Sequence, residues 1–220
     1  EMSDLKVIPI KSSDTYNWLL KKHYAKRIPN ITDSFGLFDK SNLIGIITYG
    51  IPPSRPLCTG VCGEEHSDKV IELNRLCLQD NFKNQSSILI SKSLRMLPKP
   101  KIVVSYADTS QGHVGYVYQA TNFLYTGLSA KRTEWRIIGS NLHSKTICTQ
   151  STLEERKNNP DIYEYIDRPR KHRYIYFAAN KTDKKILKKC LKYKTHPYPK
   201  GDTSNYDSGD KVLTQMILDI

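Results

Sequence analysis

The sequence predicts an α/β fold in which a mixed central sheet is flanked by helices, with a basic C-terminal extension. Short apolar runs rich in β-branched residues alternate with segments of helical periodicity. The apolar strand at residues 70–78 is followed by a polar turn, a helix and a second apolar strand at 102–106. This order is typical of two parallel strands that are joined by a crossover helix.

The N-terminal part of the chain predicts a helix and a hairpin. Polar residues 12–14 can cap a helix that ends near His23, and Pro29 interrupts the segment after it. Residues 35–38 and 43–49 are apolar runs separated by a short polar turn, so they predict two paired strands.

Residues 50–68 contain three prolines and three glycines, which predict a long functional loop. Within it, Cys58, Cys62 and His66 follow one another at four-residue intervals, a spacing that could hold a metal ion. A loop rich in proline and glycine explains these three residues equally well without a metal.

The crossover predicts a site for an anion. Ile90, Leu94 and Leu97 form one apolar stripe of a helix that ends at Pro98. The polar turn at residues 80–87 would place backbone N–H groups and the positive end of the helix dipole where a pyrophosphate can bind.

The junction within residues 101–127 predicts a reaction centre. The strand at 102–104 runs into Ser105, Tyr106 and Asp108, and an aromatic-rich helix is predicted from near His113. Polar side chains at the end of a buried strand can act on a substrate while the helix serves as scaffold.

The predicted organisation is one domain at residues 3–180, followed by a basic helix and tail at 181–220. Residues 201–209 are expected to form a linker, and apolar residues at helical spacing in 211–220 could dock back or form a homodimer. No run approaches the roughly 20 apolar residues that span a bilayer, so no membrane partner is expected. The five cysteines lack framework spacing, which favours a reducing cytoplasm.

The charge indicates a polyanionic partner. The net charge is +12, and residues 151–200 hold fourteen Lys or Arg against six Asp or Glu. Basic residues at 168–173 lead into the aromatic strand 174–177, a combination that suits phosphate contact plus base stacking. The lysines at 184–192 are equally well explained as a solvated helix face. The predicted nucleic-acid-binding residues are Lys26, Arg27, Arg168, Arg170, Lys171 and Arg173.

This order of helix, hairpin, long strand, polar turn, helix and strand resembles the GNAT acyltransferase fold. The resemblance implies acetyl-CoA or another acyl-CoA as cofactor, with its pyrophosphate on the turn after the long strand. The turn at 82–87 departs from the family pattern because it contains no glycine. The cofactor-binding residues implied are Leu76, Cys77, Leu78, Asn84, Gln85, Ser86, Ser87, His113 and Tyr118.

A narrower resemblance covers roughly residues 15–178. The pair His23-Tyr24, the run 72–76, the run 105–108 with Gly112-His113, and the run 171–174 together resemble the phage Mom proteins. That family implies modification of the exocyclic amine of adenine in double-stranded phage DNA. The product would be a carbamoylmethyl adduct that blocks host restriction enzymes, made in the host cytoplasm.

An adenine amine is a weak nucleophile, so transfer to it needs a positioned base and a nucleotide taken out of the duplex. Asp108 is the predicted base or amine acceptor, although an aspartate there can also cap a helix. Tyr106 is predicted as acid or stacking platform, with a structural strand tyrosine as the alternative. His23 and Tyr24 would open onto the substrate, and Tyr49 would close the pocket from the other side.

Three further interpretations stay open at this point. Two imidazoles and a carboxylate could hold a non-haem iron. The acyltransferase could act on another base or on RNA, because a flipped base and an unpaired RNA base need similar aromatic walls. The chain could also be a DNA-binding module on a GNAT scaffold that does no chemistry, as the glycine-free turn allows.

Overall fold

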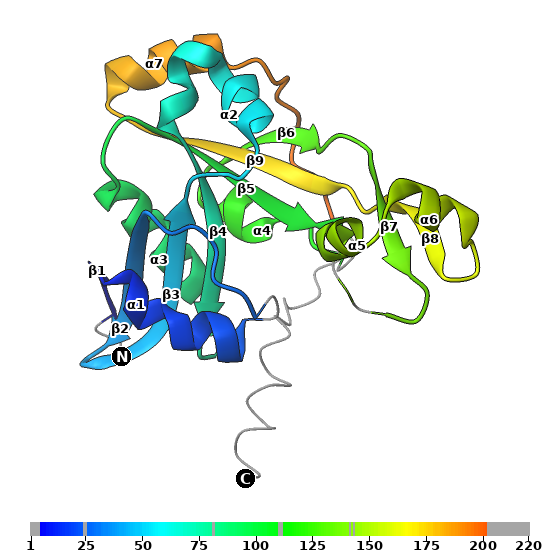
Figure 1. Cartoon of the computed structure of the whole chain (residues 1–220). Coiled ribbons are helices and arrows are strands. Elements are labelled where there is room, and N and C mark those ends of the chain that lie inside the picture. The colour runs from blue at the N-terminus through cyan, green and yellow to red at the C-terminus, as the bar shows by residue number, and fades with distance from the viewer. Residues whose placement is uncertain are drawn as a thin grey trace.

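The computed structural model describes residues 5–23, 26–80, 82–109, 112–140, 142 and 144–201. The predictions for Tyr24 and for the tail beyond residue 201 lie outside these residues. The described chain forms a seven-stranded sheet in the order β1-β2-β3-β4-β5-β9-β6 and a separate two-stranded ribbon, β7-β8 (Figure 1). The strands are β1 Leu5–Pro9, β2 Asp33–Asp39, β3 Asn42–Gly50, β4 Val70–Leu78, β5 Lys101–Asp108, β6 Leu124–Leu128, β7 Arg132–Ile137, β8 Tyr163–Arg168 and β9 Lys171–Ala178.

The predicted α/β class with a mixed sheet is confirmed. β4 and β5 pair in parallel, and the remaining neighbours in the large sheet pair antiparallel. The helix that joins β4 to β5, α3, is the predicted crossover. The helical elements are α1 Ser12–Asn17, the π-helix η1 Trp18–Lys22, α2 Arg55–Cys62, the 3-10 helix η2 Glu64–Lys69, α3 Gln85–Met96, α4 Tyr116–Ala120, α5 Ser144–Gln150, α6 Leu153–Asn158 and α7 Lys181–Cys190.

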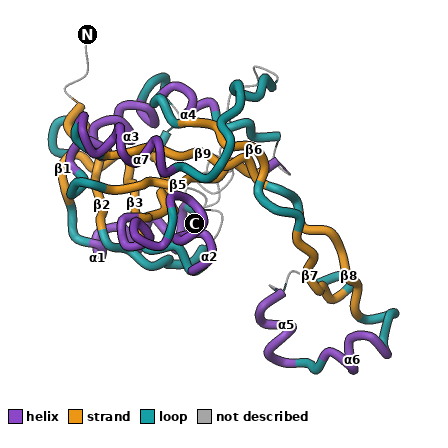
Figure 2. The backbone as a smooth tube through the Cα atoms, turned by 90° about the horizontal axis from the view of Figure 1, so that it is seen from above, coloured by secondary structure: helices purple, strands orange, loops and turns teal. Residues whose placement is uncertain are grey.

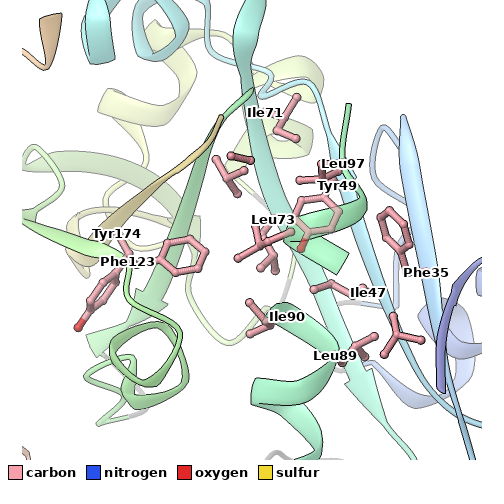
Figure 3. Close-up of a cluster of buried hydrophobic side chains, with 14 of the residues drawn as sticks. Phe35, Ile47, Tyr49, Ile71, Leu73, Leu89, Ile90, Leu97, Phe123 and Tyr174 are labelled. Atoms are coloured by element: carbon pink, nitrogen blue, oxygen red, sulfur yellow. The ribbon is translucent and has the colours of Figure 1, made fainter. Parts of the chain in front are cut away.

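The main core lies between the sheet and α3. Leu89 and Ile90 of α3 lie in one buried cluster with Ile71 and Leu73 of β4 (Figure 3). Val103 of β5 belongs to the same cluster. Strand residues alternate between faces, so one apolar set from every second position fills this side of the sheet.

The opposite face is covered by two separate groups of helices. Leu19 of η1 packs on Ile46 and Cys77 at one end of the sheet. At the other end, Val61 of α2 and Leu187 of α7 pack together on the sheet. The expected boundary between a domain and a basic extension at residue 181 stays a prediction.

The prediction of a long loop at residues 50–68 is wrong, because most of this segment is helical. Pro56 lies in the first turn of α2, where its fixed φ and missing N–H suit a helix start. Cys58, Val61 and Cys62 then share the buried face of that helix. The helix predicted from near His113 begins three residues later, at Tyr116, after Gly115 in a left-handed conformation.

The ribbon β7-β8 and the helices α5 and α6 were not predicted from the sequence. Together these elements form an arm, residues 132–168, that extends away from the large sheet (Figure 2). β7 alternates charged residues with Thr133, Trp135 and Ile137, a signal that could have identified it, whereas β8 shows no such alternation.

Gly115 offers a test of the packing between α4 and the sheet. Its φ is +81°, and an added Cβ would lie 2.5 Å from Cε2 of the buried Tyr174 ring. We expect Gly115→Ala to destabilise the protein by about 2–3 kcal/mol, as strain adds to a clash. Urea unfolding measures this difference.

Gly112→Ala is the matched control. Gly112 has a φ of +67° but nothing within 4 Å of an added Cβ. It should therefore show only the conformational cost, about 1 kcal/mol. Equal losses in the two variants would contradict the packing of Gly115 on Tyr174.

Candidate active site where two parallel strands separate

The parallel strands β4 and β5 are paired along only part of their length. Their register runs through Val70↔Ile102, Ile71↔Val103 and Glu72↔Val104, and then ends. β4 nevertheless stays paired with β3 as far as Leu78, and β5 stays paired with β9 as far as Asp108. Beyond Glu72 the inner edges of these two strands therefore have no strand partner among the described residues.

The start of α3 lies just beyond this open end of β4. Asn84 adopts a left-handed conformation with φ +71°, and its carbonyl oxygen accepts a hydrogen bond from Ser87 Oγ. The first turn of a helix leaves N–H groups without intrahelical partners, and its dipole favours an anion there. The predicted cofactor-binding residues at 76–78 and 84–87 thus belong to two consecutive segments, the end of β4 and the start of α3.

These segments fit an acyl-CoA. The unpartnered edge of β4 can hydrogen-bond an extended pantetheine chain as an added strand would, and the helix start can bind the pyrophosphate. His113 and Tyr118 lie on the β5 side instead. The His113 N–H donates to the Asp108 carbonyl oxygen at 3.3 Å, and the Tyr118 ring packs 5.4 Å from that of Tyr174.

Polar side chains gather beside the separated strand ends, on the face away from α3. Tyr106 pairs in register with Arg173, and Asp108 pairs with Lys171. Lys171 Nζ lies 3.4 Å from Asp108 Oδ2. We call this group, with Glu72 and Arg75 of β4, the polar cluster; its members are Glu72, Arg75, Tyr106, Asp108, Lys171 and Arg173.

Burial perturbs the titration of this cluster. Burial raises the pKa of Glu72, although the charges of Arg75 and Lys171 act in the opposite direction. Burial also raises the pKa of Tyr106 to about 12, against the effect of Arg173. Perturbed groups that lie together are typical of functional sites, although structural ion pairs show them too.

His23 joins the cluster from the end of η1. Burial and then the nearby Arg75 guanidinium lower its pKa to about 4, so its imidazole is neutral at pH 7. A neutral imidazole can accept a proton or a hydrogen bond. The structure therefore brings together His23, Tyr106 and Asp108 out of the predicted catalytic residues.

Tyr49 does not reach this site. It is fully buried in the main core, where its hydroxyl and Ser93 Oγ form a hydrogen bond of 2.7 Å. Burial raises its pKa, so the phenol stays protonated. The prediction that Tyr49 closes the pocket is wrong, because its side chain faces α3.

Two of the basic residues predicted to bind nucleic acid make hydrogen bonds within the protein. Arg170 donates to the carbonyl oxygens of Ser129 and Leu128, at 2.6 and 3.4 Å. Arg173 donates to Thr126 and stacks 3.5 Å from the centre of the Tyr193 ring. These two side chains therefore hold the structure together around β9.

The other four basic residues are differently placed. Arg168, at the base of the arm, lies 3.8 Å from Glu134 and keeps nearly half of its side chain exposed. Lys26 and Arg27 are exposed near the end of η1, and Lys171 pairs with Asp108.

The prediction that strand 174–177 stacks on bases is wrong for Tyr174 and Phe177. Tyr174 and Phe177 are buried, on opposite faces of the sheet. The Tyr174 hydroxyl donates to the Val114 carbonyl oxygen, so this ring is a core residue. Of the aromatic residues in this strand, Tyr176 alone stays partly exposed.

Two contributors to the site were missed by the sequence analysis. Arg132 and Tyr193 both act electrostatically on Tyr106, one from the base of the arm and the other from the segment after α7. Tyr193 lies 87 residues beyond Tyr106 in the chain, and no local motif marks it.

The predicted metal ligands do not converge. Cys58 and Cys62 face the core, and burial raises the pKa of both thiols, that of Cys62 to about 11. In the described residues, the single group of three His, Cys, Asp or Glu donors consists of Glu65, His66 and Cys190. That part of the chain thus holds no two imidazoles with a carboxylate, and the site residues do not fit the iron alternative.

Comparison with known proteins identifies the family. The family model of the Mom proteins matches residues 4–200. The chain belongs to the Mom protein family. It is 29% identical over 192 residues to the methylcarbamoylase Mom of Escherichia phage Mu, covering 81% of this chain and 77% of that protein.

Solved acetyltransferases show weaker similarity. A putative acetyltransferase from Acinetobacter baylyi aligns with a TM-score of 0.46 and 9% identity, covering 80% of this chain and 93% of that one. A probable acetyltransferase from Staphylococcus epidermidis has a TM-score of 0.44 and 12% identity, covering 79% of this chain and 98% of that one.

Among the described residues, no helix is both long and apolar enough to cross a membrane.

The lowered pKa of His23 predicts acid sensitivity. A group whose folded pKa is about 4, against an ordinary value of 6.5, stabilises the folded state above pH 6.5 and loses that contribution as the pH falls toward 4. We expect a loss of up to roughly 3 kcal/mol over this window. Urea unfolding at a series of pH values measures it.

His23→Gln is the comparison variant, since glutamine does not titrate. Its stability curve should be flatter than that of the parent between pH 6.5 and 4, whatever its absolute stability. Parallel curves would show that His23 is not the group responsible.

Proposed function

We propose that this chain is a DNA-modifying transferase that adds a carbamoylmethyl or related acyl-derived group to the exocyclic amine of adenine. Membership of the Mom family and the similarity to a methylcarbamoylase support the proposal. The observation that carries it is the polar cluster beside the separated ends of β4 and β5. A modification of this kind would protect phage DNA from host restriction enzymes.

The open strand edge and the start of α3 would hold the donor. An acyl-CoA bound there would supply an activated acyl carbon, and direct attack on it would give an N-acyl adenine. A carbamoylmethyl product would need a donor that reacts at a methylene carbon. Residues 76–78 would bind along the β4 edge, and residues 84–87 would bind the phosphates. The acyl end would then lie beside Tyr106 and Asp108, at the end of β5.

Asp108 is the residue to which we assign proton transfer. As the amine nitrogen forms its bond to the donor carbon and the bond to the carrier breaks, one amine proton must leave. The Asp108 carboxylate can accept it, and Lys171 holds that carboxylate at the end of β5. Tyr106, protonated at neutral pH because its pKa is about 12, can donate a hydrogen bond to the leaving group.

Duplex DNA is the proposed partner, with the target base taken out of the stack. Arg132 and Arg168 pair in register at the base of the arm, and Arg132 acts on Tyr106. Phosphate contact at this place would put the DNA backbone next to the polar cluster. A two-stranded ribbon of this kind can enter a major groove.

Replacement of Asp108 tests the assigned chemistry. In cells that express Asp108→Asn, modified deoxyadenosine should fall at least about 100-fold, because the proton acceptor is lost. Mass spectrometry of nucleosides from plasmid DNA measures it. The product mass also identifies the group, since a carbamoylmethyl group contains a nitrogen atom that an acetyl group lacks.

Asp167→Asn is the control, because Asp167 is an exposed aspartate on β8 that should leave modification unchanged. Calorimetry should show that Asp108→Asn still binds coenzyme A. Full modification by Asp108→Asn would refute the role of Asp108. If the parent protein leaves DNA unmodified but modifies RNA, the substrate is RNA. If it modifies neither DNA nor RNA, the chain is better explained as a binding module.

The salt dependence of DNA binding tests the position of the interface. Arg132→Gln combined with Arg168→Gln should flatten the slope of log affinity against log salt concentration by about 2, one for each lost phosphate contact. Fluorescence anisotropy with a duplex measures the slope. Lys188→Gln combined with Lys189→Gln removes the same charge from the exposed side of α7 and should leave the slope unchanged. A slope that flattens in this control pair, but not in the Arg132 and Arg168 pair, would place the DNA on α7.

A further inference from the structure

A second group of potential ligands lies apart from the polar cluster, where η2 meets α7. Glu65 and His66 belong to η2, and Cys190 is the last residue of α7. One donor atom from each of the three residues lies within 4.8 Å of the other two. The residues come from distant parts of the chain, so the tertiary structure creates this group.

The His66 ring has unusual surroundings for a buried imidazole. Its Nδ1 and Nε2 atoms are both buried, and neither has a hydrogen-bond partner among the described residues. Nε2 nevertheless lies 3.2 Å from Glu65 Oε1. A buried polar atom without a partner costs free energy, so an ion that binds one of the two ring nitrogens would stabilise this arrangement.

We propose that Glu65, His66 and Cys190 bind a zinc ion. Thiolate, imidazole and carboxylate are the ligands that zinc takes in proteins, at about 2.0–2.3 Å. Donor atoms on such a tetrahedron are about 3.5 Å apart, and the exposed Glu65 side chain is free to rotate into place. Water completes the fourth position.

The charges balance on binding. Zn²⁺ displaces one proton from the Cys190 thiol, and the thiolate together with the Glu65 carboxylate neutralises the ion. No oxidant or reductant is involved. Cys62 remains outside this set, because its thiol donates to the Leu187 carbonyl oxygen at 3.6 Å.

The ion would join α7 to η2 and support the segment after α7. The Lys192 N–H donates to the Val61 carbonyl oxygen at 2.9 Å, and the next residue, Tyr193, stacks on Arg173 of the polar cluster. The proposed site lies three residues before a side chain that contacts the polar cluster, so the ion would act on that cluster by holding the chain in place.

Cobalt substitution tests the site directly. The full-length protein, freed of metal with a chelator and mixed with one equivalent of Co²⁺, should develop the near-ultraviolet absorption of a thiolate bound to cobalt. Zn²⁺ should abolish that band by competition. Cys190→Ser should lose the band, whereas Cys148→Ser, at an exposed cysteine on the arm, should keep it.

Thermal unfolding supplies an independent measurement. Zn²⁺ at 100 times its dissociation constant should raise the Tm of the parent and of Cys148→Ser by roughly 5–10 °C, and should leave that of His66→Gln unchanged. A band that persists in Cys190→Ser would overturn the proposal. So would the absence of both band and Tm shift in the parent, which would leave Glu65 and His66 as an ion pair.

Discussion

The short parallel pairing between β4 and β5 is the constraint on which the candidate site depends. The two strands stop pairing after Glu72 and Val104, but each keeps its antiparallel neighbour on the outer side. The sheet thus loses hydrogen bonds only along its inner edges. An unpartnered strand edge is a template for another extended chain, which makes it suited to a ligand with amide groups.

The alternation of side chains explains why this place is both stable and polar. Ile71 and Leu73 of β4 face α3 and are buried in the main core, whereas Glu72 lies on the other face. The same alternation on β5 puts Val103 in the core and Tyr106 in the polar cluster. The scaffold and the reacting groups can therefore be supplied by the same strands.

Burying the Glu72 carboxylate in the polar cluster costs free energy that nearby positive charges must offset. Glu72 is largely removed from water, and an isolated buried carboxylate would be strongly unfavourable. Arg75 and Lys171 offset that penalty, and Lys171 also pairs with Asp108. The basic residues around β9 thus serve the folded state, and Arg170 and Arg173 also do so through their hydrogen bonds to Ser129 and Thr126.

The sequence by itself determined the strands from β2 to β5 and the helix α3, because their apolar periodicity is strong and local. It also supplied the Mom resemblance and proposed His23, Tyr106 and Asp108 as candidates. The prolines and glycines of α2 concealed that helix, and the arm was not recognised, since β8 lacks alternation and only β7 carries it. Only the tertiary structure decided which polar groups meet. Tyr193 reaches the polar cluster, Cys190 and not Cys58 lies beside His66, and Tyr49 is enclosed in the core. These three placements depend on the order of strands in the sheet and on contacts between distant segments, which local sequence patterns do not encode.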